Sequence, residues 1–315
     1  MNYSEYHSKP SKIIIHNPAL TNSLNFISEK NREGFLFLGN PDIEVFKNDY
    51  QTFKKAVSLN GTEVIELTDI IKKSKEMYQL LHLINVNPNQ IYTRDAMITI
   101  PWLPGKCIIG RMREPIRRIE SIVMREVANI FGLEVISFTP TDLFIEGGDV
   151  IPIILDGKRF LLVGYERRTS ESAIHFLKKQ LMPKDLDGII GIKLADWRIN
   201  LDGGCVPINE STIVAHPESL LSAFIVTAKG EEKIDPLLFF EKNGFSIITV
   251  SKEESIFKQA CNILCLGDNN LVMYDHSLEI LKNSNEIDSF KTVSVSSREL
   301  AKGRGGPRCM SRPIY

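Results

Sequence analysis

The sequence predicts a single mixed α/β domain, residues 1–315, in which β-hairpins alternate with single helices. Its composition lies at the globular average, since 43% of the 315 residues are hydrophobic and 24% are charged, and a chain of this size can bury a large core. Short β-like runs alternate with helical patterns. No Pro-, Ser- or Gly-rich stretch marks a linker, and the sequence has neither a Rossmann GxGxxG turn nor a P-loop.

The first expected elements are a strand at residues 12–16, a helix whose apolar stripe covers residues 50–57, and a strand at residues 63–67. Gly61 is expected to stop that helix. Apolar residues at helical spacing over residues 116–130 predict the clearest helix of the chain, which Gly132 is expected to close with a left-handed cap.

A β-hairpin is expected next, because the apolar runs 149–155 and 159–164 are joined by Asp156-Gly157, a dipeptide that type I′ turns prefer. Thr169 or Ser170 is expected to cap a helix over residues 173–181. Further strands are expected at residues 188–194, 211–215, 246–250, 263–266, 271–274 and 292–295.

Charge and apolar runs restrict the possible partners. The chain has 38 Lys+Arg and 39 Asp+Glu, a formal net charge of −1, which argues against nucleic acid or an anionic membrane as a partner. The longest apolar runs have only strand length, so we expect no membrane segment and a cytoplasmic location. The five cysteines include no paired CxxC motifs, which argues against a disulfide framework and a metal site.

Four polar segments are candidates for a functional site: residues 88–95, 144–149, 200–204 and 303–310. Each alone is most simply a turn with solvated side chains. Together they supply acids at several strand ends and a cysteine, Cys309, on a Gly/Pro-rich loop. This combination predicts a site that binds a delocalised cation and attacks it.

The guanidinium group is such a cation. It is planar, always protonated and a poor electrophile, so a protein that attacks its carbon must hold the N–H groups with carboxylates. The attack requires a thiolate, and the departing amine requires a proton, usually from a histidine oriented by a carboxylate. Arg304 and Arg308 flank Cys309, so we expect a partly accessible thiol with a lowered pKa.

The chain resembles the guanidino-group-modifying superfamily, and within it the arginine deiminase and dimethylargininase-like bacterial proteins. The resemblance runs in order from about residue 7 to the end of the chain. Its segments include Asn89 to Asp95, Gly-Arg-Met followed by Pro-Ile-Arg-Arg-Ile-Glu over 110–120, Phe-Ile-Glu-Gly-Gly-Asp over 144–149, Arg168-Thr169, Asn200-Leu-Asp202, Cys261-Asn262, and Gly-Gly-Pro-Arg-Cys-Met-Ser-Arg-Pro over 305–313.

The resemblance implies a pentein fold, with five ββαβ units around a pseudo-fivefold axis, and no helical insertion of the kind that classical arginine deiminases carry. It also implies hydrolysis of arginine or a methylated arginine through a cysteine thiouronium intermediate, giving citrulline and ammonia or an alkylamine. No metal or organic cofactor is expected. The expected partner is a small-molecule substrate, and a homodimer is left open.

Site residues follow from the resemblance position by position. Cys309 matches the nucleophile, Asp95 and Asp202 match the acids that grip the guanidinium, and Glu146 matches the acid beside the catalytic base. The positions that match substrate-binding residues, mostly at the amino-acid end of arginine, are Asn89, Arg111, Asp149 and Arg168.

Asn200 is the main departure from the family, because it stands where the pattern has a catalytic histidine. An amide cannot shuttle a proton as imidazole does, and none of the six histidines lies in a segment that suggests a replacement. The chain is therefore a hydrolase with another proton route such as water, a knockout that still binds, or a non-catalytic guanidino-binding protein. Amidino transfer to an amine is a further alternative, because it uses the same intermediate.

Overall fold

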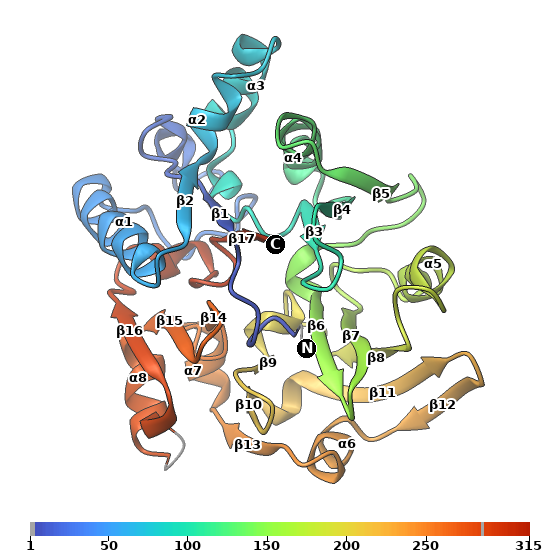
Figure 1. Ribbon diagram of the computed structural model, residues 1–315. Coiled ribbons are helices and arrows are strands. Elements are labelled where there is room, and N and C mark those ends of the chain that lie inside the picture. The colour runs from blue at the N-terminus through green and yellow to red at the C-terminus, as the bar shows by residue number, and fades with distance from the viewer. Residues whose placement is uncertain (1–3, 285–286) are drawn as a thin grey trace.

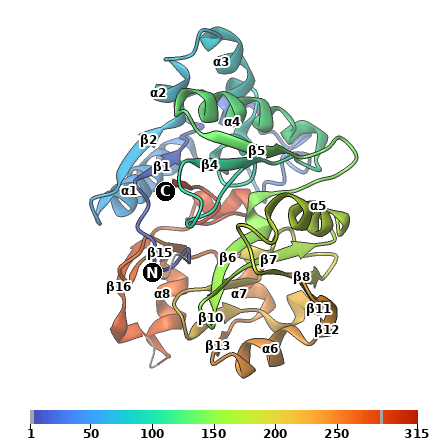
Figure 2. The ribbon, with the colours of Figure 1, turned by 45° about the vertical axis from the view of Figure 1, so that its right-hand side comes forward.

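The computed structural model describes residues 4–284 and 287–315. Within these ranges the strands form five sheets, which lie around a common centre with helices α1, α4, α5, α6 and α8 on the outside (Figure 1). The same arrangement is seen from another side in Figure 2. Each sheet contains one antiparallel and one parallel pair that share a strand, which is the pairing of a ββαβ unit.

Four of these units follow one another along the chain. The first consists of β3 (Met97–Thr99), β4 (Lys106–Ile109), α4 (Ile119–Ile130) and β5 (Glu134–Phe138). The second consists of β6 (Val150–Leu155), β7 (Lys158–Tyr165), α5 (Ser172–Leu181) and β8 (Gly188–Leu194). The third has β9 (Cys205–Pro207), β10 (Thr212–Ala215), α6 (Pro236–Lys242) and β13 (Ser246–Thr249). The fourth has β14 (Leu264–Cys265), β15 (Asn270–Tyr274), α8 (Asp275–Lys282) and β16 (Lys291–Val295).

The fifth unit is closed by both ends of the chain. Strand β17 (Arg312–Ile314) pairs antiparallel with β1 (Lys12–Ile15), and β1 pairs parallel with β2 (Glu63–Glu66), which follows helix α1 (Ile43–Ser58). The remaining elements lie between or beside the units: β11 (Leu220–Thr227) and β12 (Gly230–Ile234), which extend the second sheet beyond β8, and helices α2 (Leu67–Ile71), α3 (Met77–Asn85) and α7 (Lys252–Ile256).

The mixed α/β class predicted from the sequence is confirmed, and the pseudo-fivefold symmetry stays a prediction. The β6–β7 hairpin turns at Asp156 and Gly157, both with positive φ (48° and 74°), as a type I′ turn requires. Gly132, with φ 64°, follows α4 as expected. Ile116 was wrongly placed in that helix, because it lies in a separate 3₁₀ turn and is exposed.

The predicted cap of α5 is wrong. No side chain caps this helix, whose N-cap residue is Glu171. The Ser170 hydroxyl instead accepts a hydrogen bond from the Phe144 amide (3.1 Å), and the Thr169 hydroxyl donates to Asp149 Oδ2 (2.6 Å). The capping residues of the sequence pattern therefore connect two loops near the centre of the molecule.

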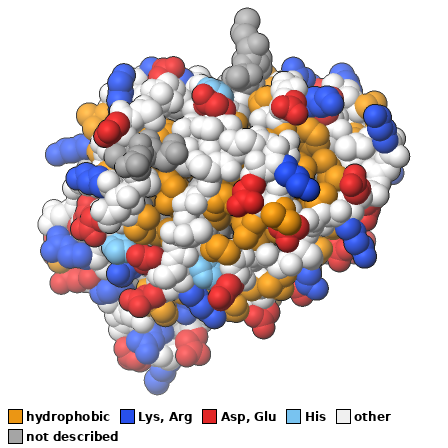
Figure 3. Space-filling view, turned by 90° about the horizontal axis from the view of Figure 1, so that it is seen from below, with side chains coloured by type: hydrophobic (Ala, Val, Ile, Leu, Met, Phe, Trp, Pro, Cys, Tyr) orange, Lys and Arg blue, Asp and Glu red, His pale blue; other side chains and the backbone are white. Residues whose placement is uncertain are grey.

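Apolar side chains between the sheets and the outer helices form the core, which includes the strand residues Ile13, Ile14, Leu162 and Ile190. On the face seen from below, hydrophobic, acidic and basic side chains are interspersed (Figure 3). In the described ranges, no helix has both the length and the hydropathy needed to cross a bilayer.

Candidate active site

The repeated unit explains where the polar centre of the molecule comes from. A buried polar residue lies in the loop just before the first strand of each unit: Asp95 before β3, Asp149 before β6, Asp202 before β9, Asn262 before β14 and Cys309 before β17. Hydrogen bonds connect these five loops to one another. Residues far apart in sequence therefore share one site because the same loop recurs in every unit.

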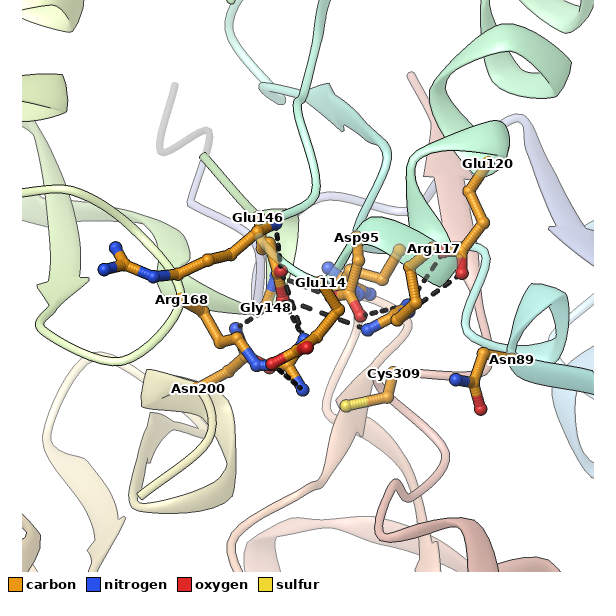
Figure 4. Close-up of polar contacts among 12 residues, drawn as sticks. Asn89, Asp95, Glu114, Arg117, Glu120, Glu146, Gly148, Arg168, Asn200 and Cys309 are labelled. Carbon is orange, nitrogen blue, oxygen red and sulfur yellow. Dashed lines mark hydrogen bonds and ion pairs between the residues drawn. The ribbon is translucent and has the colours of Figure 1, made fainter. Parts of the chain in front are cut away.

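Cys309 lies at the middle of this site (Figure 4). Asn262 Nδ2 donates a hydrogen bond to its Sγ atom at 2.9 Å, and Sγ is 3.3 Å from Asp202 Oδ2. The Cys309 amide donates to Asn262 Oδ1 at 3.0 Å. The thiol is thus held between an amide and a carboxylate.

The predicted low pKa of Cys309 is wrong for the site without substrate. Burial raises the pKa of Cys309 well above its usual value, and the carboxylates of Asp202 and Asp95 add to this effect because they oppose a second negative charge. Arg308, which was expected to lower the pKa, points its guanidinium at Asp202 (2.9 Å) and Glu5 (2.8 Å).

Asp95 is bound on both oxygens. Its Oδ1 atom accepts the Gly148 amide at 3.0 Å, and its Oδ2 atom accepts Arg117 Nη2 at 2.9 Å. Arg117 is fixed by two parallel bonds of 2.8 Å to Glu120. Burial raises the pKa of Asp95, with Glu146 acting in the same direction and Arg117 in the opposite one.

Asn200 bridges two buried carboxyl groups. Its Nδ2 atom donates to Asp149 Oδ2 at 3.0 Å and to Glu146 Oε2 at 3.3 Å. Burial raises the pKa of Asp149 well above its usual value. Burial also opposes ionisation of Glu146, but Arg168 (3.3 Å) and Arg117 outweigh it and lower the pKa of Glu146. The two acids that share this amide therefore lie in different environments, since burial opposes ionisation of Asp149 while two arginines favour it in Glu146.

Two adjoining hollows open onto Cys309. The first has a volume of about 330 Å³ and is lined by Phe35, Leu36, Asn89, Tyr92, Asp95, Arg117, Arg168, Ile199, Asn200, Gly303, Arg304, Gly305 and Cys309. The second, of about 400 Å³, shares Asn200, Arg304 and Cys309 with the first and also contacts Asp202 and Asn262.

Most of the residues predicted from the sequence are brought together. Asn89, Asp95, Arg168, Asn200 and Cys309 line the first hollow, and Asp202 lines the second. Glu146 and Asp149 lie behind Asn200 and hold its amide.

Arg111 is the exception. It lines a separate hollow with Arg118 and Arg125, and its guanidinium carbon is 5.6 Å from the centre of the Phe144 ring. Arg117, from the same segment, lines the Cys309 hollow instead. Of these two arginines, Arg117 and not the predicted Arg111 lines the hollow at Cys309, and a role for Arg111 in substrate binding stays a prediction.

Sequence reasoning missed four residues of the site: Glu5, Arg117, Asn262 and Arg308. Asn262, Arg308 and Arg117 lie inside segments that carry the resemblance, and Arg117 is in the same segment as Arg111. Glu5 has no local signal, because a single glutamate in a polar N-terminal segment is ordinarily solvated. In the described parts of the chain, no three His, Cys, Asp or Glu side chains are grouped so that they could hold a metal ion.

A mixed α/β fold that places a thiol among carboxylates and arginines defines an enzyme that acts on guanidino groups. Comparison with known proteins agrees. A family model described as arginine deiminase matches residues 72–315. Arginine deiminase of Streptococcus pneumoniae (strain CGSP14) is 24% identical over 303 residues, which cover 85% of this chain and 71% of that protein. The chain belongs to the arginine deiminase family.

Solved structures show the same fold. The N-terminal domain of ArgZ, an arginine dihydrolase from cyanobacteria, superposes with a TM-score of 0.70 at 17% identity, over 96% of this chain and 97% of that domain. A dimethylarginine dimethylaminohydrolase gives a TM-score of 0.64 at 17% identity, over 96% and 99%. Unliganded AgrE gives 0.69 at 17% identity, but the chain spans only 39% of its length. The resemblance to arginine deiminases is thus confirmed by the family model, and the solved structures confirm a shared fold.

Proposed function

We propose that this chain is a cysteine-dependent hydrolase of the guanidinium group of arginine or a methylated arginine, with citrulline and ammonia or an alkylamine as products. The observation that carries the proposal is the position of Cys309 Sγ, 3.3 Å from Asp202 Oδ2 at the edge of a hollow that Asp95 also lines. A nucleophile thereby lies where two adjoining hollows meet, each lined by one cation-binding group.

The polar lining supports a zwitterionic substrate. Asp95 and Asp202 would take the guanidinium N–H groups at the Cys309 end. Arg168 and Arg304 line the same hollow, and their Nε atoms are buried without a hydrogen-bond partner among the described residues. Because guanidinium groups match carboxylates, these two arginines would hold the α-carboxylate of the substrate.

The proposed reaction begins with the thiol proton. The bound guanidinium places a positive charge beside Asp95, Asp202 and Cys309, which reduces the cost of forming the thiolate. Asp202 Oδ2 accepts the proton and Sγ attacks the guanidinium carbon. The proton then passes to the departing nitrogen, which is released as ammonia or an alkylamine. Its release forms the S-alkylthiouronium on Cys309. Water attacks the carbon of this intermediate and the C–S bond breaks, which releases citrulline. One proton of the water is taken up by the site and the other by the Cys309 thiolate.

We propose Asp202 as the acceptor of the thiol proton because Asn200 cannot accept it. The Asn200 amide has no titratable proton, and its Nδ2 atom is already committed to Glu146 and Asp149. Arg308 Nη1 also lies 2.9 Å from Asp202 Oδ2, so it competes with the thiol proton for the same oxygen. We therefore propose a slow hydrolase.

A non-catalytic guanidino-binding protein is the second candidate. The observation that favours it is that Asp95 and Asp202 each already have an arginine partner, Arg117 and Arg308, and that Asn200 replaces the family histidine. Binding requires only the hollow and its charges, so it survives the loss of a proton carrier.

We further propose that residues 1–315 form one pentein domain with pseudo-fivefold symmetry. The five sheets with the same pairing of strands support this arrangement. The chain has no inserted helical block between β2 and β3 beyond the short helices α2 and α3. A cytoplasmic location is also proposed.

Intact-protein mass spectrometry after incubation with arginine tests the function, with Cys309→Ser as the control. Hydrolysis predicts a transient adduct on Cys309 and citrulline plus ammonia from arginine alone. A requirement for an added amine would indicate amidino transfer. Arginine binding by calorimetry with neither adduct nor product would overturn the hydrolase in favour of the binding protein.

A further inference from the structure

The carboxylate of Glu5 is buried against Arg94 and Arg308 and lines neither of the two hollows at Cys309. Its side chain is 7% exposed. Its Oε1 atom accepts Arg94 Nη1 at 2.8 Å and Arg308 Nε at 3.1 Å, and its Oε2 atom accepts Arg308 Nη2 at 2.8 Å. One carboxylate from the N-terminal segment thus binds two buried guanidinium groups.

Both arginines adjoin residues of the site in sequence. Arg94 precedes Asp95, and Arg308 precedes Cys309. The two loops are also tied directly, because Arg94 Nε donates to the Arg308 carbonyl at 2.7 Å and the Arg94 amide donates to the Cys309 carbonyl at 3.3 Å. Glu5 therefore acts on the loop of the cation-binding acid and on the loop of the nucleophile together.

Arg308 is divided between two carboxylates. Its Nε and Nη2 atoms form the fork to Glu5, and this fork leaves Nη1 to reach Asp202 Oδ2 at 2.9 Å. The same Asp202 oxygen is 3.3 Å from Cys309 Sγ. The orientation of the guanidinium plane, which Glu5 fixes, decides how much of the Arg308 charge acts on Asp202.

We infer that Glu5 is a positioning residue that holds Arg94 and Arg308 and thereby limits the positive charge that reaches Asp202 and Cys309. Without Glu5, two buried cations would lose their shared counter-charge, and Arg308 would turn both of its outer nitrogens toward Asp202. The field at Sγ would become more positive, which favours the thiolate. Arg308 would at the same time cover Asp202 Oδ2, the oxygen that is proposed to take the proton.

Alkylation of Cys309 tests this inference without arginine. Sγ contacts Asn262 and Asp202 and is also influenced by the charges of Asp95, Tyr92 and Tyr274, and Glu5→Gln replaces none of these side chains. We expect iodoacetamide to modify Cys309 about tenfold faster at pH 8 in Glu5→Gln than in the unmodified chain, since one pKa unit is a tenfold change in thiolate. Glu5→Asp should stay within about threefold, because its charge is kept.

A matched control is Glu44→Gln, which removes an exposed glutamate paired with Lys47 on α1 and should leave the alkylation rate unchanged. Peptide mapping identifies the modified cysteine. If Glu5→Gln does not fold, Glu5→Gln/Arg94→Gln removes one charge of each sign and should show the same acceleration. An alkylation rate that stays unchanged in a folded variant would overturn the inference and leave Glu5 a purely structural residue.

Turnover gives a second readout, which rests on the proposed function. If that function holds, Glu5→Gln should lower kcat for arginine at least tenfold with a smaller change in KM, because the proton-accepting oxygen is covered. If Glu5→Gln is alkylated faster but the unmodified chain does not turn over arginine, the role of Glu5 is supported and only the proposed hydrolase is contradicted.

Discussion

Asn262 and Cys309 hold each other by two hydrogen bonds: the Asn262 Nδ2 atom donates to Cys309 Sγ at 2.9 Å, and the Cys309 amide donates to Asn262 Oδ1 at 3.0 Å. The two residues occupy the same position in two neighbouring units, just before β14 and β17. One amide side chain therefore fixes both the backbone and the sulfur of the proposed nucleophile.

Replacement of Asn262 by alanine should lower kcat for arginine by roughly 100-fold, because a displacement of about 1 Å of a reacting atom has an effect of this size. KM should change less, since Asn262 does not contact Asp95. Steady-state kinetics checks this, with Asn129→Ala on the surface of α4 as the control. Equal losses in both variants would show that Asn262 does not position the sulfur.

Asn200→His should raise kcat by about 10²–10⁴-fold, the usual contribution of a positioned acid or base. An imidazole at this position would lie beside Glu146, whose pKa is lowered so that it stays ionised and stabilises the imidazolium. The measurement is citrulline formation as a function of pH, and a new pH dependence between about 5 and 8 is expected. An unchanged rate and profile would place the proton route elsewhere.

Arg117 and Arg111 should respond differently to the same change. Arg117→Lys removes a two-point bond to Glu120 and the bond to Asp95 inside the hollow, so kcat/KM should fall at least tenfold. Arg111→Lys lies outside that hollow and should alter kcat/KM by less than about threefold. The reverse order would restore the arginine that was first expected from the sequence pattern.

Regular elements with strong local signals were predictable from the sequence. The β6–β7 hairpin carries its turn dipeptide and was placed correctly, and α4 has a long apolar stripe and was found, although its start was placed too early, at Ile116. Strands β3, β9 and β17 have three residues each, which is too short for a period to appear. They exist because neighbouring strands pair with them.

Site residues that lie in a recognisable motif could be predicted from the sequence. Site residues whose position depends on how side chains pack could not. Asp95, Asp202 and Cys309 lie in recognisable segments and do converge. Choosing Arg117 over Arg111, or finding Glu5, requires knowledge of which side chains turn inward. The pKa of Cys309 was mispredicted for the same reason, since the partners of Arg308 are not visible in its neighbours in sequence.

Two buried groups predict a loss of stability in acid. Burial lowers the pKa of His16 to about 3, so below its ordinary value of 6.5 the unfolded chain binds a proton that the folded chain does not. Burial opposes ionisation of Glu5, but Arg308 and Arg94 outweigh it and lower the pKa of Glu5 from 4.5 to about 2. The stabilising contribution of Glu5 is therefore complete above pH 4.5 and is lost as the pH falls toward 2.

Urea unfolding at a series of pH values should show the free energy of unfolding falling by roughly 1.4 kcal/mol per pH unit for each group in its window. In His16→Leu the fall between pH 6.5 and about 3 should be smaller, while the part of the fall that Glu5 contributes below pH 4.5 should remain. A variant with the same pH dependence as the unmodified chain would show that His16 is not the group responsible.

The pairing of β1 with β17 also has a consequence for biosynthesis. Ser11 contacts the Ile314 carbonyl across 303 positions of sequence, so β1 leaves the ribosome long before its antiparallel partner exists. Until then, Ile13 and Ile14 border an open strand edge, the kind of edge that invites aggregation. Cys309 lies in the loop before this late strand, so the candidate active site is completed in the same step that covers the edge of β1. A chain truncated before Cys309 would lack both the proposed nucleophile and the strand that pairs with this edge.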